Sequence, residues 1–195
     1  MQTRRLVIRK HPEVYDISDD TTLLADNLTV NDDDKVLEVC SGSGYVSLVA
    51  AQKAKYVVGI DINPHAVKLA KLNARLNNIL NVEFVLGDLF SPIRAKFNLI
   101  TINPPYLQGY QGMNTNNHSY LDYSWNGGED GRSVTERFLA EVEEYLEACG
   151  RIFIVQSSLS GYDKTVEELS KEGFLTRIIA EKKLFFETIY LLEAT

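Results

Sequence analysis

The stretch KVLEVCSGSGYVSLVAAQKAKYVVGID, residues 35–61, decides the fold. It begins with a hydrophobic run at 35–40 and ends with a second one at 56–61, and each run is typical of a buried strand. A glycine-containing turn and a helical pattern at 45–53 separate the two runs. A strand, a crossover helix and a second strand form a right-handed unit in which the strands are parallel. The stretch therefore predicts an α/β fold built on a parallel sheet.

The rest of the chain continues the alternation. Further helices are predicted at 63–78, 131–147 and 162–172, and further strands at 81–86, 97–103, 151–157, 174–181 and 186–194. The last two strands lie too close together for a helix between them, so we expect a hairpin that brings one antiparallel strand into the sheet. No linker interrupts the pattern. We expect one domain over 1–195, in which 1–34 form an N-terminal segment and helix.

Composition narrows the class of protein. The 195 residues are 45% hydrophobic and 24% charged, which is typical of a globular protein, and no run has the length of a membrane span. No secretion signal is visible, so we expect a cytoplasmic protein without membrane contact. Cys40 and Cys149 have no metal-ligand spacing, and we expect no metal site. The net charge of −7 makes nucleic acid unfavourable as the main partner.

The turn after the first strand carries the first chemical motif. Gly42 and Gly44 let the backbone turn tightly and approach a ligand, and Asp61 ends the next strand, where a carboxylate can accept hydrogen bonds from two ribose hydroxyls. This arrangement binds adenosine, and on these residues alone NAD and S-adenosylmethionine both remain open. The third glycine of the nicotinamide fingerprint is absent, because Ser47 stands in its place. A cofactor without phosphates fits better.

The second motif is Asn103-Pro104-Pro105-Tyr106, at the end of the strand 97–103. Neither proline has an N–H to donate, and the residue before each proline is held extended. The four residues therefore form a stiff corner that aims one amide side chain and its neighbouring carbonyls in a fixed direction.

Together these motifs resemble a known family. LEVCSGSG, DINP (61–64), GDL (87–89) and NPPY occur in the order of the class I S-adenosylmethionine-dependent methyltransferases. VYDISDDTTLLADNL (14–28) and WNGGEDGRSVTERF (125–138) narrow the resemblance to the HemK/PrmC family, in its short archaeal and eukaryotic branch. The resemblance implies a Rossmann-like domain with a seven-stranded, mostly parallel sheet and helices on both faces.

The resemblance also implies roles for individual residues. The catalytic corner would be Asn103, Pro104, Pro105 and Tyr106, where the Asn103 side-chain oxygen and the Pro104 carbonyl accept the two N–H groups of a planar amino group. S-adenosylmethionine would be bound by Thr21, Glu38, Cys40, Gly42, Gly44, Asp61, Ile62, Asp88, Leu89 and Asn103.

Two positions depart from the family pattern. The family usually has glycine in place of Cys40 and Glu-Pro in place of Asp16-Ile17. Cysteine is small enough to keep the turn if its φ is negative, so we interpret Cys40 as a packing residue. Asp16-Ile17 keeps the charge and loses the kink.

The resemblance points to a protein substrate. It implies methylation of the glutamine in the GGQ loop of a class I translation release factor. A planar amino group on a base of tRNA, rRNA or DNA is an alternative, and protein lysine is a second one. Base methyltransferases that act on duplexes usually carry an added recognition region and a basic surface, and this chain has neither.

Two further segments are assigned to partners. Residues 107–130 form a long loop rich in tyrosine, asparagine and glycine, and we expect it to cradle the substrate. His118 lies in this loop and is not expected to be catalytic. The strand within 81–89 should be an open edge of the sheet, and the family resemblance implies that a small zinc-ribbon activator protein covers it.

Overall fold

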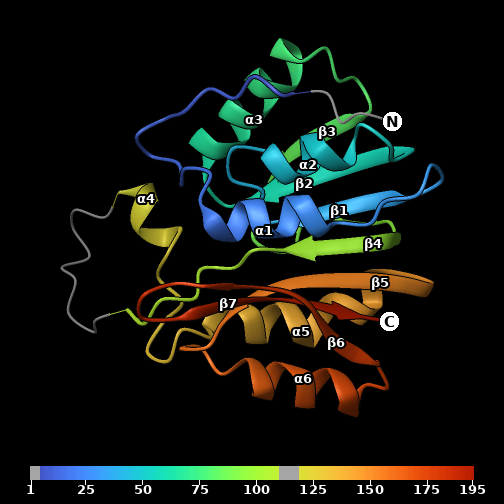
Figure 1. The fold of residues 1–195 in the computed structure, drawn as a ribbon. Helices are drawn as coiled ribbons and strands as arrows, with labels where there is room; N and C mark the ends of the chain where they lie inside the picture. Colours follow the sequence, from blue (N-terminus) through green and yellow to red (C-terminus); the bar gives the residue numbers. More distant parts are fainter. Residues whose placement is uncertain (1–4, 110–118) are drawn as a thin grey trace.

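The computed structural model describes residues 5–109 and 119–195. Its seven strands form one sheet in the order β3-β2-β1-β4-β5-β7-β6 (Figure 1). All strands run parallel except β7, which is antiparallel to both of its neighbours. The predicted fold class is confirmed, including the C-terminal hairpin and the edge position of β3. The strands are β1 Lys35–Val39, β2 Tyr56–Asp61, β3 Val82–Leu86, β4 Phe97–Ile102, β5 Leu146–Ser157, β6 Thr176–Lys183 and β7 Thr188–Ala194.

Six helices are present in the described residues. They are α1 Asp19–Asn27, α2 Tyr45–Ala50, α3 Pro64–Leu76, α4 Tyr120–Tyr123, α5 Ser133–Tyr145 and α6 Tyr162–Lys171. None of these helices is long and apolar enough to cross a membrane.

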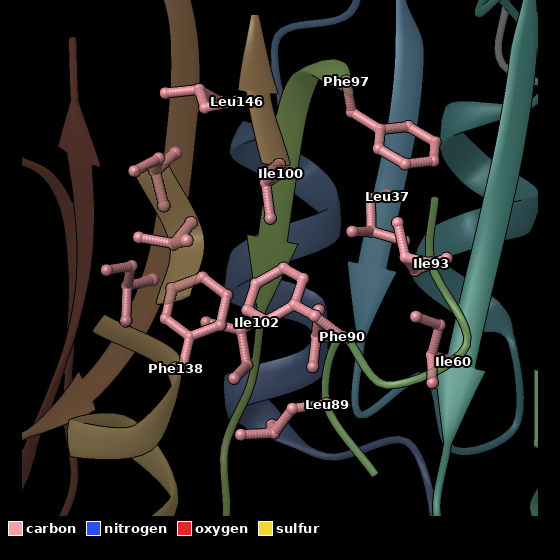
Figure 2. Close-up of a cluster of buried hydrophobic side chains, with 14 of the residues drawn as sticks. Leu37, Ile60, Leu89, Phe90, Ile93, Phe97, Ile100, Ile102, Phe138 and Leu146 are labelled. Atoms are coloured by element: carbon pink, nitrogen blue, oxygen red, sulfur yellow. The ribbon is translucent and has the colours of Figure 1, made fainter. Parts of the chain in front are cut away.

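The helices cover both faces of the sheet, because successive strand residues point to opposite sides. On β1, Val36 packs with Leu24 of α1 and Val46 of α2. The next residue, Leu37, points to the opposite face and belongs to the cluster that contains Phe138 of α5. Figure 2 shows this second cluster, in which side chains from β1, β2 and β4 meet the segment 89–93 and α5.

One boundary differs clearly from the sequence prediction. The strand predicted at 151–157 begins five residues earlier, at Leu146, and the preceding helix ends at Tyr145. The pairing with β4 shifts register between Phe97 and Leu99, and Cys149 has a left-handed φ of 61°. A bulge of this kind adds residues to a strand without continuing its hydrophobic pattern, so the pattern alone hides the early start.

Candidate active site

The cavity of interest lies where β1, β2 and β4 end. It has a volume of about 490 Å³ and is lined by segments that follow these three strands, by the start of α1 and by residues near α4 and α5. This is the edge of a parallel sheet at which doubly wound folds bind ligands. The cavity brings together all predicted site residues except Gly44, namely Thr21, Glu38, Cys40, Gly42, Asp61, Ile62, Asp88, Leu89, Asn103, Pro104, Pro105 and Tyr106.

Asp61 organises the turn after β1. Its Oδ2 accepts a hydrogen bond from the Gly42 backbone N at 2.7 Å, and its Oδ1 accepts one from the Asn63 backbone N at 2.9 Å. Burial raises the pKa of this carboxyl, and the two backbone donors act in the opposite direction. Each carboxylate oxygen can accept more than one hydrogen bond, so Asp61 keeps capacity for ligand hydroxyls while it holds the turn.

Glu38 lies beneath the turn and is only 4% exposed. Its Oε2 accepts hydrogen bonds from the backbone N of Ser47, at 2.8 Å, and from the Ser47 hydroxyl. Burial raises the pKa of Glu38 to about 8. Glu38 lines the cavity, and its hydrogen bonds with Ser47 connect β1 to the start of α2.

Three residues of the turn, Cys40, Gly42 and Gly44, have left-handed backbones. The consequences differ between Gly44 and Cys40. Gly44, with φ of 79°, faces away from the cavity: a Cβ there would lie 2.7 Å from the Phe84 ring and 2.8 Å from Ala70. Its role is close packing of the turn on the sheet. Cys40 has φ of 61°, so the expectation of a negative φ is wrong. A left-handed φ is least strained in glycine, which accounts for the usual family residue at this position.

The corner Asn103–Tyr106 contributes an unpaired acceptor. The Oδ1 of Asn103 is buried and has no hydrogen-bond partner among the described residues, and the same holds for the Ser41 hydroxyl. Both residues line the cavity. Buried polar atoms are almost always paired in folded proteins, so unpaired ones in a cavity wall point to a ligand.

A buried carboxylate that the sequence did not single out fixes the other end of the corner. Asp20 is 3% exposed, and its Oδ2 accepts hydrogen bonds from Tyr106 at 3.1 Å and from Tyr15 at 3.2 Å. Burial, assisted by the Asp20 charge, raises the pKa of Tyr106, which therefore stays a neutral donor. The sequence signal for Asp20 is weak, because acidic residues are common in the first turn of any helix.

Arg137 is a second cavity residue that the sequence does not indicate. Its guanidinium pairs with Asp88 at 2.7 Å across the mouth of the cavity. Asp88 and Arg137 are 49 residues apart, and nothing in the local sequence predicts the pair.

The segment after α4 braces the corner from outside. The Leu107 N donates to Trp125 O at 2.9 Å, and Gly127 N donates to Leu107 O at 2.8 Å. A Cβ on Gly131 would lie 2.3 Å from the Tyr106 carbonyl oxygen, so only glycine fits there. Within the predicted cradle 107–130, seven described residues line the cavity, namely Leu107, Tyr120, Tyr123, Ser124, Trp125, Asn126 and Gly128. The remaining part, 110–118, includes His118 and lies outside the described residues.

The fold is that of the Rossmann-like methyltransferases. The solved Mtq2–Trm112 complex of E. cuniculi, described as responsible for the methylation of the eRF1 translation termination factor, superposes with a TM-score of 0.73. The match covers 93% of this chain and 98% of that one, at 21% identity.

Sequence comparisons agree and are more specific. The profile of the methyltransferase small domain matches residues 6–121. A Methanocaldococcus jannaschii protein with the name "Putative protein N5-glutamine methyltransferase" is 43% identical over 188 residues, covering 96% of this chain and 94% of that one. The release factor glutamine methyltransferase of Thermodesulfovibrio yellowstonii is 36% identical over 77% of this chain, which spans 56% of that protein. The chain belongs to the methyltransferase small domain family, in the group of the protein N5-glutamine methyltransferases.

Proposed function

We propose that this protein transfers a methyl group from S-adenosylmethionine to the side-chain amide nitrogen of a glutamine, and that the acceptor is the GGQ-loop glutamine of a class I translation release factor. The observation that carries the proposal is the buried Oδ1 of Asn103 in the Asn103–Tyr106 corner, which has no hydrogen-bond partner in the part of the chain that the structure describes. The 43% identity to a protein named as an N5-glutamine methyltransferase supports the same acceptor.

The cavity suits S-adenosylmethionine. Asp61 can accept the ribose hydroxyls, the unpaired Ser41 hydroxyl offers a polar contact beside the turn, and Ile62 is a half-exposed apolar side chain for the adenine. Thr21 and the backbone from Cys40 to Gly42 would bind the amino-acid end. Among the described lining residues Arg137 is the only positively charged side chain, and it already pairs with Asp88. This wall favours a cofactor without phosphates over a dinucleotide.

The bound cofactor supplies an electrophilic methyl group on a sulfonium. The acceptor amide is a poor nucleophile, since its nitrogen lone pair is shared with the carbonyl. The Asn103 Oδ1 and the Pro104 carbonyl can each accept one N–H of this amide, which orients the nitrogen. Both acceptors are more favourable when the nitrogen gains positive charge, so they stabilise the transition state more than the ground state. Orientation and close approach of the reacting atoms supply much of the rest.

The reaction requires no strong base in the corner. An alkylated amide nitrogen is acidic enough to lose its proton to water. Tyr106 cannot serve as a base, because its hydroxyl is a neutral donor to Asp20. Its ring can pack against the planar amide while the Asp20 contact keeps the ring in place.

Methyl transfer to the cognate release factor tests the proposal. Purified protein, together with the zinc-ribbon activator where one copurifies, should use S-adenosylmethionine to add one methyl group to the release factor. The single mass increment should be absent when the GGQ glutamine is replaced by alanine. Transfer to the alanine variant, or to tRNA or rRNA in place of protein, would contradict the proposal. A thermal shift with S-adenosylhomocysteine and none with NADH is the matching cofactor test.

We also propose that a small zinc-ribbon activator adds to the free edge of β3. Within residues 5–109 and 119–195 this strand pairs with β2 alone, and Leu86 on it is 54% exposed. An open edge with apolar side chains is a site for strand addition. Leu86→Lys should abolish copurification of the activator, whereas Leu175→Lys, at the far edge of the sheet, should not. Retention by Leu86→Lys would contradict this interface.

A further inference from the structure

The turn between β6 and β7 exposes two adjacent phenylalanines. Phe185 is 92% and Phe186 is 84% exposed, and Leu184 beside them is also exposed. The two rings contact each other edge to face, with centroids 4.6 Å apart. Single exposed apolar residues are common on protein surfaces, but a contiguous aromatic pair at the tip of a hairpin is costly in water and marks an interaction site. Residues 184–186 are called the aromatic tip below.

Strand direction places the aromatic tip at the cavity edge of the sheet. β5 is parallel to β4, and β7 is antiparallel to both β5 and β6, so β6 runs in the same direction as β4. The turn that follows β6 therefore lies at the same edge as the corner that follows β4, and Figure 1 shows the hairpin loop at the end of the sheet where α4 lies.

The hairpin also projects beyond that edge. Ile102, the last residue of β4, is level with Ile154 of β5, which pairs with Leu192 of β7. Phe186 lies six residues before Leu192, in the turn that leads into β7. At about 3.3 Å per residue this separation amounts to up to roughly 20 Å. The aromatic tip thus extends past the level at which the catalytic corner begins.

The hairpin is tied to the cavity wall. The Leu184 N donates to Glu187 O at 2.8 Å, which closes the turn, and the Glu187 carboxylate accepts a hydrogen bond from Ser157. Lys182 pairs with Asp19 at 3.5 Å, next to the buried Asp20 of the site. The negative charge of Glu187 contributes to the raised pKa of both Tyr106 and Tyr15. These contacts hold the hairpin beside the corner.

We propose that the aromatic tip docks the acceptor protein, by inserting into an apolar depression close to the methylated glutamine. This proposal rests on the proposed function. A protein that delivers a side chain into the cavity must cover the edge from which the aromatic tip projects. Shared position with the proposed active site is therefore the reason for assigning the surface to the acceptor.

Other occupants fit less well. The activator proposed for β3 lies at the opposite end of the strand order from β6, so it would not cover the tip. Nucleic acid would need stacking platforms and free cations. The two rings here meet edge to face, and the nearest lysines are engaged, Lys182 with Asp19 and Lys183 with Glu181.

The test compares a whole acceptor with a short one. The double variant Phe185→Ser/Phe186→Ser is assayed with the release factor and with a short peptide that contains the Gly-Gly-Gln sequence. Leu175→Ser is the matched control, since Leu175 is 74% exposed and precedes β6 at the opposite edge. We expect the double variant to raise KM for the release factor at least tenfold, with kcat and peptide turnover unchanged. The control should match the wild type in every assay.

Each other outcome is decisive. An unchanged KM for the release factor in an active double variant would overturn the docking proposal and leave the proposed function intact. An equal loss on the peptide and the release factor would show damage to the site, and would also overturn it. If the wild type neither methylates the release factor nor binds it by calorimetry, the proposed function and the docking proposal fail together.

Discussion

Two loops of the molecule start at the same level and are built in opposite ways. Val39 of β1 pairs with Ile102 of β4, so the turn that begins at Cys40 and the corner that begins at Asn103 leave the sheet side by side. The turn has glycines and left-handed backbones, and the corner has two prolines. The turn needs conformational freedom to fold back on itself, whereas the corner needs stiffness to hold one direction.

The difference extends to hydrogen bonding. In the turn, the backbone N–H groups find partners inside the protein: Ser41 N on Ile60 O at 2.9 Å, Gly42 N on Asp61 and Gly44 N on Ser41 O at 2.8 Å. In the corner, the prolines lack the donor and the Asn103 oxygen has no partner among the described residues. The backbone of the turn is thus held by internal hydrogen bonds that shape the cavity, and the corner keeps a side-chain acceptor available. Cofactor binding and catalysis should therefore respond separately to mutation.

The largest expected effect is in the corner. Asn103→Ala should reduce the rate of methyl transfer by about 10²–10³, which is the usual loss when one preorganised polar group at a developing charge is removed. Cofactor affinity should change far less than the rate, because in the proposed mechanism the Asn103 side-chain oxygen faces the acceptor. The measurement is a single-turnover rate at saturating cofactor, combined with calorimetry.

The matched control for this variant is Asn98→Ala. Asn98 lies near the start of β4, where its Oδ1 accepts from Lys35 N at 2.6 Å, so the change should alter stability and leave the rate intact. Equal loss of rate in both variants would mean that Asn103 supports the folded structure and does not bind the acceptor directly.

The turn should show the reverse pattern. Asp61→Ala should weaken S-adenosylmethionine binding by roughly 1.5–3 kcal/mol, the range for hydrogen bonds to a charged group. The rate at saturating cofactor should change much less than in Asn103→Ala. Calorimetry with S-adenosylhomocysteine measures the affinity, and an unchanged affinity would remove Asp61 from the ribose site.

The contribution of Glu38, which lies beneath the turn, to the free energy of unfolding should depend on pH. Burial raises its pKa to about 8 from an ordinary value of 4.5, so the folded protein binds this proton more tightly than the unfolded chain does. The resulting stability is fully present below pH 4.5 and is lost as the pH rises through about 8.

Wild type should therefore lose stability relative to Glu38→Gln across this window, by up to about 1.4 kcal/mol per pH unit. Denaturant unfolding at a series of pH values measures the difference. A constant difference between the two proteins from pH 5 to pH 8 would contradict the raised pKa.

The smallest effect concerns the backbone of the turn. Cys40 has a left-handed φ, which costs about 1–2 kcal/mol in residues with a Cβ. Cys40→Gly should therefore be more stable than Cys40→Ala by about 1 kcal/mol, since both lose the thiol and only glycine relieves the strain. Thermal unfolding compares them, and equal stability would mean that the turn relaxes around residue 40.

The contrast between the two loops also separates what could be predicted from what could not. The order of the motifs and the hairpin of β6 and β7 follow from local patterns, because strands and turns are encoded over a few residues. The left-handed φ of Cys40 and the close packing of Gly44 against Phe84 do not, since both depend on how the turn is folded onto the sheet.

Contacts between residues far apart in the sequence could not be predicted either. The hydrogen bond between Tyr106 and Asp20 joins positions 86 apart in the chain. Nothing near either residue indicates the partner, and the acidic start of α1 looks like ordinary helix capping. The exposure of Phe185 and Phe186 was unpredicted because the local pattern is misleading here. Hydrophobic residues at the end of a strand normally indicate burial, whereas these two side chains are exposed.

The most direct test of the corner is its choice of acceptor. In the proposed mechanism the Asn103 oxygen and the Pro104 carbonyl accept the two N–H groups of a planar amide, and this pairing would suit a tetrahedral ammonium less well. The measurement is single-turnover methyl transfer to two peptides that differ only in the target residue, Gly-Gly-Gln and Gly-Gly-Lys. The glutamine peptide should react at least about 100-fold faster, as expected when preorganised acceptors favour one reacting group. Equal rates, or faster transfer to lysine, would contradict the role given to Asn103 and Pro104.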